Sequence, residues 1–429
     1  MAEGRESIRF AGIWNVYAHV LLFGLIFLEW SFSALVAWKI PGLVTVAAIM
    51  CLFSPLLLFA KIVELDKGNL ILFLLIMAMT LFSCLRDGDL SNNLLLLAAV
   101  LAGYLVSVFF SPEEFARVFG NVVQLLAAVS LPVFTLSVLA PNLIDRLPLL
   151  ASSYMDQAGA QVHNAFFAVG ITHSMASRNC GITWEPGAFS ILICVALYLA
   201  LLFPRKGNTS RIILLVITEL TTLSTMGIAV MCAILLLMHS GDKSVKKSVV
   251  VAVVVMALLA ASAFGLMDYI LNALFSKLEG LVSGSQALSV TTQDRLNAVI
   301  YPLSAFADAP VFGVGYTEFL EININQCNGV ATNTFANWFA LMGCIYGMPC
   351  ALFYFRAVYK GLKRLHANWI VALTVIGASI LMLSTEDLIR ISLVYVIVFY
   401  GSSGLSGRSV FTVNQIEENG VPKEVSSAS

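Results

Sequence analysis

The sequence predicts an all-α polytopic membrane protein with about twelve transmembrane helices and two large loops on one side of the membrane. Of its 429 residues, 59% are hydrophobic and 11% are charged, whereas ordinary globular domains carry about 25% charged residues. The mean hydropathy is +0.90. Apolar runs of about 16–20 residues recur, and a helix of that length crosses about 30 Å of hydrocarbon. This composition excludes a soluble enzyme, a nucleic-acid-binding protein and a disulfide-rich scaffold.

Apolar windows place the candidate spans along the chain. They cover residues 10–28, 41–60, 69–85, 94–110, 121–140, 186–203, 248–267, 335–355, 369–385 and 388–402. A further apolar stretch, 212–239, is too long for one span and short for two. Ser224-Thr225-Met226-Gly227 interrupts it, so we expect two short helices there. The total is twelve spans, and an even number puts both termini on one side.

The basic residues orient the spans. With the N-terminus in the cytoplasm, 17 of the 24 Lys and Arg residues fall inside and 7 outside, in the direction of the positive-inside rule. The seven outer ones are Lys39, Arg86, Arg146, Arg178, Lys277, Arg295 and Arg390. We therefore expect both termini to lie in the cytoplasm.

The spans divide the chain into six regions, two of which are long outer loops. These regions are the N-terminal helices over 1–140, a first large loop over 141–185, central helices over 186–267, a second large loop over 268–334, C-terminal helices over 335–402 and a cytoplasmic tail over 403–429. Long loops in compact proteins are usually functional or disordered. Both loops contain aromatic and apolar residues, which favours order and predicts that the chemistry lies at the outer face.

This topology predicts a labelling pattern. A membrane-impermeant thiol reagent is expected to label a single cysteine at Ser283 in the second outer loop, but not one at Ser244 in a cytoplasmic loop. The experiment uses intact spheroplasts, and labelling at position 244 would reverse the orientation.

The first outer loop ends in a charged motif. Arg178 precedes Glu185-Pro186-Gly187 by seven residues. Proline suits the first helical position, so a span is expected to begin at Pro186. Glu185 would then lie beside a helix N-terminus, whose partial positive charge favours the ionised carboxylate. Glu185 is either a structural cap or an acidic group held at the membrane surface.

The second outer loop carries two further motifs and ends at Asn333. Asp294-Arg295 opens an amphipathic stretch, and Pro310-Val311-Phe312-Gly313-Val314-Gly315 precedes Tyr316. The glycines predict a turn where the backbone can approach a ligand closely. The run lacks the third glycine and the strand–helix context of a dinucleotide site.

These motifs, in this order, resemble those of the bacterial O-antigen and capsular repeat-unit polymerases, which share a superfamily with the O-antigen ligases. The resemblance covers roughly residues 175–350. It implies a GT-C-like inner-membrane glycosyltransferase that acts on the periplasmic side. The donor and the acceptor would both be oligosaccharides linked to undecaprenyl pyrophosphate. The product would be O-antigen or capsular polysaccharide, and a chain-length regulator would be an additional partner.

One departure separates polymerase from ligase. The ligases carry a His-Asn pair before the span that follows the second large loop, whereas this sequence has Thr332-Asn333 there. His163-Asn164 lies in the first loop instead. The difference favours a polymerase and leaves a ligase as the alternative. A lipid-linked oligosaccharide flippase is the alternative from another class, although internal repeats and several charges at mid-membrane, which are typical of transporters, are absent from the sequence.

The resemblance also suggests roles for individual residues. Arg178 and Arg295 would bind the pyrophosphate, because guanidinium matches phosphate oxygens in a bidentate fork. Glu185 is the first candidate for the general base that accepts the acceptor's proton, with Asp294, Glu318 and the lone loop histidine His173 as alternatives. Further substrate contacts would come from Asp294, Tyr316, Asn333 and Arg390. No cofactor or metal is expected.

Four other residues carry predictions. Glu219 lies inside a short span, where an ionisable group is usually functional or paired. Arg390 would be ion-paired with the neighbouring Glu386-Asp387. Cys180 and Cys327 are the two cysteines in the long outer loops, where an oxidising compartment permits a disulfide between them.

Overall fold

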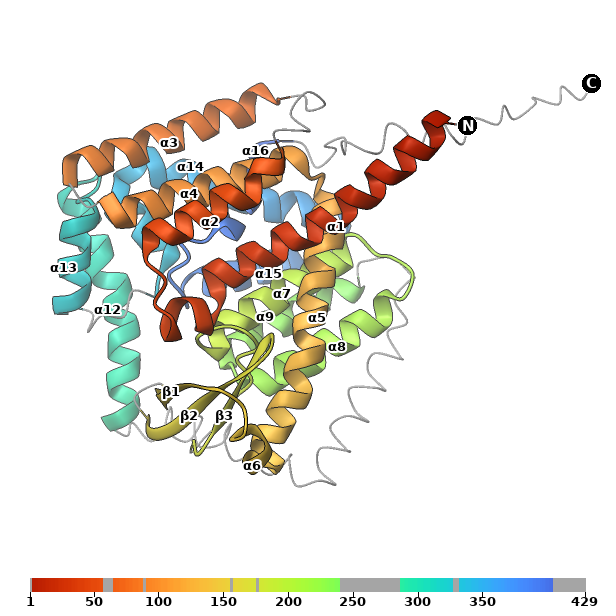
Figure 1. The fold of residues 1–429 in the computed structure, drawn as a ribbon. Coiled ribbons are helices and arrows are strands. Elements are labelled where there is room, and N and C mark those ends of the chain that lie inside the picture. The colour runs from red at the N-terminus through yellow and green to blue at the C-terminus, as the bar shows by residue number, and fades with distance from the viewer. Residues whose placement is uncertain are drawn as a thin grey trace, which may run out of the picture.

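A computed structural model describes residues 2–56, 65–87, 90–154, 157–174, 177–239, 286–326 and 332–403. Side chains are described over these ranges except in 2–11, 90–91 and 286–296. The predicted span at 248–267 and the tail beyond 403 lie outside the described residues. Within them the chain is mostly helical, with a small sheet against one end of the helices (Figure 1).

Before residue 173, the described part of the chain forms several helices and the sheet. These elements are α1 (Ala2–Trp30), the π-helix η1 (Ser33–Ala37), α2 (Gly42–Phe53), α3 (Lys67–Asp87), α4 (Leu90–Phe109), α5 (Pro112–Leu139), α6 (Pro141–Ile144), β1 (Leu149–Tyr154), β2 (Gln157–Ala165) and β3 (Ala168–Thr172).

The rest of the described chain is helical. Its elements are α7 (Pro186–Leu202), α8 (Asn208–Thr222), α9 (Thr225–Leu235), the 3-10 helix η3 (Leu236–His239), α12 (Gln286–Asp308), α13 (Tyr316–Gln326), α14 (Thr334–Arg364), α15 (Trp369–Leu383) and α16 (Ser392–Ser402). The predicted interruption of 212–239 is confirmed, since α8 ends at Thr222 and α9 begins at Thr225.

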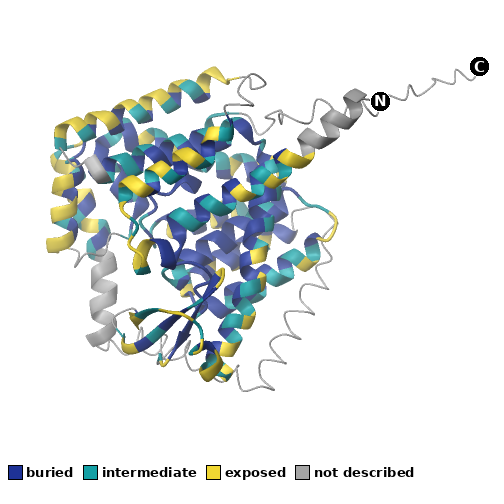
Figure 2. Cartoon of the chain, viewed as in Figure 1, coloured by how far each residue is buried: buried dark blue, intermediate teal, exposed yellow. Residues whose placement is uncertain are grey.

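Five of the described helices are long and apolar enough to cross a membrane. They cover Gly12–Trp30, Lys67–Asp87, Asn92–Phe109, Pro112–Leu139 and Thr334–Arg364. Five shorter apolar helices accompany them. Large apolar residues are exposed on α1, α2, α3 and α15, and exposed positions can be followed along α2 and α3 in Figure 2. A soluble protein buries such side chains, so the pattern is that of a polytopic membrane protein.

Long-range hydrogen bonds join the helices at two ends of the bundle. At the end that carries the sheet, which we call the sheet end, the amide and hydroxyl of Ser392 donate to Glu29 Oε2 at 3.0 and 2.7 Å. At the opposite end, Arg364 pairs with Glu113 at 2.8 Å. Contacts from both predicted outer loops reach the sheet end.

The sheet corrects the expectation of an all-α protein. Its three antiparallel strands lie in the order β1-β2-β3 within the first long loop. A long segment at the end of a bundle must still pair its backbone N–H and C=O groups, and hairpins allow it to do so internally. Close packing against α5 and α6 fixes the position of β3, because a Cβ at Gly170 would lie 2.6 Å from Ile144 Cγ2 and 3.2 Å from Ser137 Oγ.

Acid is expected to loosen this sheet through Asp145. The Thr172 hydroxyl donates to Asp145 at 2.6 Å, and the ring nitrogens of His173 and His163 lie 3.1 and 3.4 Å away. The Thr172 hydrogen bond and the two histidines hold the pKa of Asp145 below its ordinary value. The resulting stabilisation is present above the unfolded pKa of about 3.9 and is lost as the pH falls through the lower folded pKa.

Amide hydrogen exchange checks this prediction. Protection factors in residues 149–172 should fall between pH 5 and pH 3 in the wild type and change less in Asp145→Asn. Equal acid sensitivity in both proteins would show that Asp145 is not the responsible group.

Candidate functional site

Arg178 caps the broken end of α8. Its Nε donates to the Thr222 carbonyl and its Nη2 to the Leu223 carbonyl, both at 3.2 Å. Leu223 adopts a left-handed φ of 52°, which ends the helix and leaves these carbonyls without helical N–H partners. The guanidinium therefore fixes the break, and three of its five donors are not used by these two bonds.

Glu185 is the N-cap residue of α7, and Pro186 occupies the start of the helix as predicted. The carboxylate makes no capping bond to the helix. It instead accepts from Trp184 Nε1 at 3.1 Å, and the Trp184 ring stacks on Trp30 at the end of α1 with centroids 5.8 Å apart. Two stacked indoles thus set the direction of this half-buried carboxylate.

Arg178 and Glu185 surround the same buried pair. The Tyr154 hydroxyl and the Cys180 sulfur lie 2.9 Å apart, and the charges of both Arg178 and Glu185 act on them. Burial raises the pKa of Cys180 to about 12, so its thiol is un-ionised at neutral pH. Cys327, its proposed disulfide partner, lies outside the described residues.

Gly187, the third residue of the Glu-Pro-Gly motif, leaves room for Glu386. A Cβ on Gly187 would lie 2.6 Å from Glu386 Oε1. Glu386 is buried, and its carbonyl accepts from the Thr334 hydroxyl at 2.6 Å. The turn before α16 is therefore tied to the first turns of both α7 and α14. Sequence reasoning assigned Glu386 only to an ion pair with Arg390.

Glu219 holds the break between α8 and α9 against α7. The fully buried carboxylate accepts from the Ser190 hydroxyl at 2.5 Å and from the Thr222 hydroxyl at 3.5 Å. Glu219 Oε2 has no hydrogen-bond partner among the described residues. A Cβ at Gly227 would overlap with the Ser190 hydroxyl and the Glu219 carboxylate, which explains the glycine of this motif. Glu219 is thus a positioning residue for the break that Arg178 caps.

Replacing Glu219 by Ala is expected to destabilise the protein. The change leaves the Ser190 hydroxyl without its acceptor and opens a cavity, and large-to-Ala changes in a core cost about 2–5 kcal/mol. Glu219→Gln keeps the volume and an acceptor oxygen and should cost less. Thermal unfolding in detergent, followed by size exclusion, measures both, and an Ala variant as stable as the Gln variant would contradict the assignment.

Tyr316 and Arg390 meet at the junction of α3, α4, α13 and α16. The Arg390 guanidinium lies 6.0 Å from the Tyr316 ring centroid and donates to Asn92 Oδ1 at 2.9 Å. The amide of Tyr316 donates to Asp87 Oδ2 at 2.6 Å, so Asp87 caps α13. Arg86 in turn pairs with Asp87 at 2.8 Å. Asp87 therefore has a structural role in this junction.

The predicted ion pair of Arg390 is wrong for the described residues. Asp387 is oriented inward, where burial raises its pKa and the charge of Arg390 partly opposes that rise. The guanidinium remains exposed and lies beyond 4.0 Å of either carboxylate.

Asn333 is the N-cap of α14, where its Oδ1 accepts from Ala336 N at 2.9 Å. This bond holds the Asn333 side chain against the helix start. The neighbouring Thr332 hydroxyl is buried and has no partner among the described residues.

The glycines of the Pro310–Gly315 run approach the chain's own backbone. Val314 and Gly315 donate to the carbonyls of Ala340 and Leu341 at 2.9 and 3.0 Å, where α14 is kinked at Gly343. A Cβ at Gly315 would overlap with Arg86 and Asp87. The turn thus packs closely on helices α3 and α14, whereas its predicted approach to a ligand stays a prediction.

Some of the predicted site residues cannot be placed by their side chains. Asp294 and Arg295 belong to α12, but their side chains lie outside the described residues. Glu318 lies exposed in the first turn of α13. In the part of the chain that the structure describes, no group of three His, Cys, Asp or Glu side chains could hold a metal ion.

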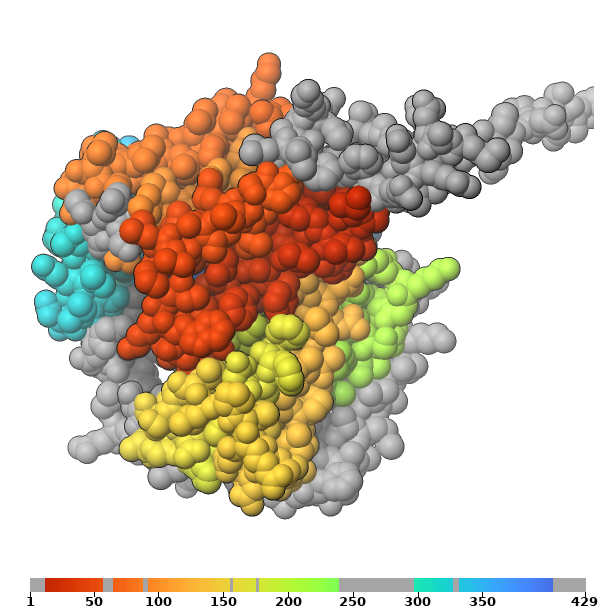
Figure 3. Space-filling model, in the orientation of Figure 1, coloured from red at the N-terminus to blue at the C-terminus, as the bar shows by residue number. Residues whose placement is uncertain are grey.

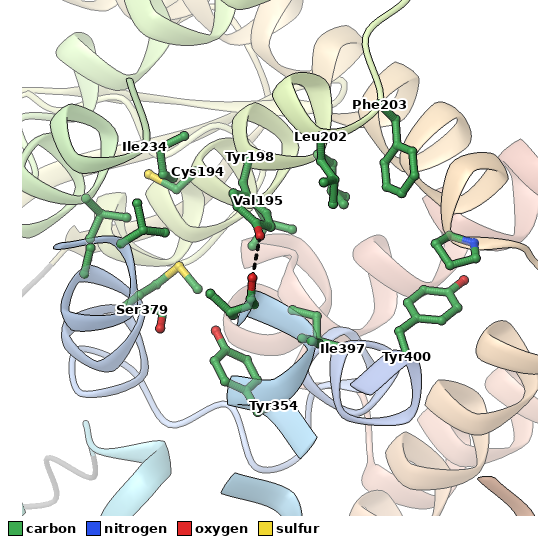
Figure 4. A pocket seen from close by; sticks show the side chains of 18 of the residues that line it. Cys194, Val195, Tyr198, Leu202, Phe203, Ile234, Tyr354, Ser379, Ile397 and Tyr400 are labelled. Atoms are coloured by element: carbon green, nitrogen blue, oxygen red, sulfur yellow. Dashed lines mark hydrogen bonds between the residues drawn. The ribbon is translucent and has the colours of Figure 1, made fainter. Parts of the chain in front are cut away.

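An apolar cavity lies between α7, α9, α14, α15 and α16, toward the opposite end of the bundle (Figure 4). The Tyr198 hydroxyl in its wall donates to the Val358 carbonyl at 3.0 Å, so even this polar group is satisfied. A smaller cavity continues it toward the sheet end. The two cavities share Cys194, Val230 and Met382, and the smaller one also touches Gly187, Ser190, Ser224 and Thr385.

Comparison with known families finds a match over part of the chain. Residues 211–355, from α8 to α14, match the family model described as O-Antigen ligase. No curated protein matches the chain. The matched region includes the α8–α9 break, α12 and the kink of α14, whereas Arg178 and Glu185 precede it. Over residues 211–355 the chain is thus similar to the superfamily of O-antigen ligases and polymerases, whose members are glycosyltransferase-like membrane enzymes.

Proposed function

We propose that the protein is an inner-membrane polymerase that joins oligosaccharide repeat units carried on undecaprenyl pyrophosphate, at the periplasmic face. The observation that supports this most is the polar strip at the sheet end. It runs from Arg178 and Glu185, through Glu386 beside Gly187, to Arg390 over Tyr316. A strip of this kind at one end of an apolar bundle suits a substrate with a charged head and a lipid tail.

The reaction exchanges one glycosidic bond for another. The acceptor hydroxyl attacks the anomeric carbon of the donor glycan while the bond from that carbon to the pyrophosphate oxygen breaks. Glu185 accepts the hydroxyl proton, and undecaprenyl pyrophosphate leaves with the bonding electrons. Cations beside a leaving group stabilise the charge that develops on it. In this proposal Arg178, Arg295 and Arg390 supply those cations, and Asp294, Asn333 and Tyr316 contact the glycan.

In this proposal the two cavities hold the lipid tail of the substrate. A polyprenyl chain whose head lies near the α7 N-terminus would follow the small cavity into the apolar one between α7 and α14. The lining is apolar there, so the cavity presents a polyprenyl chain with surroundings like the bilayer hydrocarbon that it would leave. A chain-length regulator would bind from the periplasmic side.

Purified protein in lipid vesicles tests the proposal. With one lipid-linked repeat unit as the only substrate, a polymerase yields a ladder of products. A ligase, the second candidate suggested by the description of the matching family, yields a product only when lipid A-core is added. A flippase yields neither product and moves the lipid-linked unit between the leaflets.

A further inference from the structure

The turn between β2 and β3 consists of Phe166 and Phe167, with Ala165 paired to Ala168 on either side. Two-residue hairpin loops favour Asn-Gly, Asp-Gly or Gly, because they require positive φ angles. Phe166 has a φ of 59° and an 87% exposed side chain. Bulky residues rarely adopt this conformation. Neither the backbone conformation of the turn nor its exposure to water explains why both of its residues are phenylalanines.

The turn lies on a face of α1 that carries exposed apolar side chains. Ile13, Val16 and Val20 are 62%, 65% and 54% exposed in a helix long and apolar enough to span a membrane. Their spacing of three and four residues puts them on one helical face. Phe23 and Phe27 follow at the same spacing, so this lipid-facing stripe continues toward the sheet end.

Phe167 packs directly on that stripe. Its ring meets Phe23 edge-to-face with the centroids 4.9 Å apart. Phe23 precedes Trp30, the last residue of the span, by seven residues, which is about 10 Å along a helix. The turn therefore reaches well below the end of α1, and the space-filling view shows the sheet residues lying against the α1 segment (Figure 3).

Helix α5 gives a second measure of the same depth. Gly170, three residues after Phe167, packs against α6 and the last two turns of α5, with a Cβ position 2.6 Å from Ile144 Cγ2, 3.2 Å from Ser137 Oγ and 3.4 Å from Val133 Cγ1. Val133 lies six residues before Leu139, the end of α5, or about 9 Å along the helix. Both neighbouring helices thus place the turn below their sheet-end termini.

The hairpin can enter hydrocarbon because its backbone is largely paired. Strand β2 is flanked by β1 and β3, and the Val169 amide on the outer edge of β3 donates to the Gly181 carbonyl at 2.8 Å. Unpaired backbone groups are the main obstacle to non-helical chain in a bilayer. A two-residue turn between paired strands exposes few of them.

We propose that the Phe166-Phe167 turn inserts among the acyl chains of the bilayer leaflet at the sheet end, beside α1, and anchors the sheet to the membrane. The partner of this surface is lipid hydrocarbon. The proposal depends on α1 spanning the membrane and not on the reaction that the protein catalyses.

Fluorine NMR in lipid nanodiscs tests the insertion directly. 4-Trifluoromethylphenylalanine is introduced at position 166, whose exposed side chain tolerates the substituent. Val20 on the α1 stripe serves as the lipid-facing reference, and exposed Ser153 at the far end of the same sheet serves as the water-facing one. We expect a nitroxide on the lipid acyl chains to abolish the fluorine signals of the probes at positions 166 and 20. A water-soluble gadolinium chelate is expected to abolish only the fluorine signal of the probe at position 153. Loss of the 166 signal to the chelate would overturn the proposal.

A second pair of variants covers the case in which the probe disturbs the turn. Asn tolerates positive φ, so Phe166→Asn should still form the hairpin but lose its apolar anchor, whereas Phe166→Leu keeps it. In nanodiscs we expect faster amide exchange in residues 161–172 of the Asn variant than of the Leu variant. Equal or slower exchange in the Asn variant would place the turn in water.

Discussion

Replacing Arg178 with Ala is expected to abolish chain lengthening while single repeat units still reach the cell's glycolipid. A pyrophosphate at the membrane surface needs cations, and the proposed site offers few. Loss of a hydrogen bond to a charged group costs about 1.5–3 kcal/mol, and more where the bond strengthens in the transition state. Arg178 also caps α8 through the Thr222 and Leu223 carbonyls, so its loss releases the break that lies beside Glu219.

The same result is expected for Arg295→Ala, on the sequence evidence alone. Arg→Lys at either position keeps the charge but loses the bidentate fork, and we expect partial or complete loss of lengthening. Arg146, an exposed cation in the same loop as Arg178, provides the matched control, and Arg146→Ala should leave the ladder intact. All variants are compared at equal expression by gel analysis of the glycolipid.

Two outcomes would contradict this prediction. If an Ala variant at normal level loses even the single-unit product, the protein acts as the ligase. If both Ala variants make full ladders, the arginines only anchor their loops.

Local chemistry made part of the site predictable from the sequence. Pro186 marked the start of α7, and Ser224 to Gly227 marked the break between α8 and α9, where Ser224 caps α9 by accepting from the Gly227 amide at 3.2 Å. Each signal depends on residues within one helical turn, so periodicity and capping rules detect it. The conformation of the break was therefore recognisable before its partners were known.

Contacts between distant segments were not predictable in this way. Glu29 binds Ser392 across 363 residues, and Glu386 packs on Gly187. Neither carboxylate has a local pattern that names its partner. The sheet was missed because β1–β3 lack a clear alternation of apolar and polar residues. Strand β3 is buried on both faces: Gly170 packs against α5 and α6, while Val169 and Ile171 pack in a cluster that includes Phe32. Tertiary packing overrides weak strand propensity in such segments.

Gly227→Ala is expected to lower the stability of the protein substantially. The added Cβ would overlap with both the Ser190 hydroxyl and the Glu219 carboxylate. Neither group can move freely, because they are buried and hydrogen-bonded to each other at 2.5 Å. Overpacking of a core costs about 1–3 kcal/mol and sometimes more. A shift of α9 to relieve the clash would also move the break that Arg178 caps, so chain lengthening should fall together with stability.

Gly377→Ala in α15 is the matched control, because nothing lies within 4 Å of the added Cβ there and Ala is favoured over Gly by about 1 kcal/mol in a helix interior. Thermal unfolding of both variants in one detergent should show a lower midpoint for Gly227→Ala and an unchanged or higher one for Gly377→Ala. Combining Gly227→Ala with Glu219→Ala should cost less than the sum of the two single changes, because the second removes one of the groups that the new methyl meets. Strict additivity, or a Gly227→Ala protein as stable as the wild type, would mean that α7, α8 and α9 do not meet at this carboxylate.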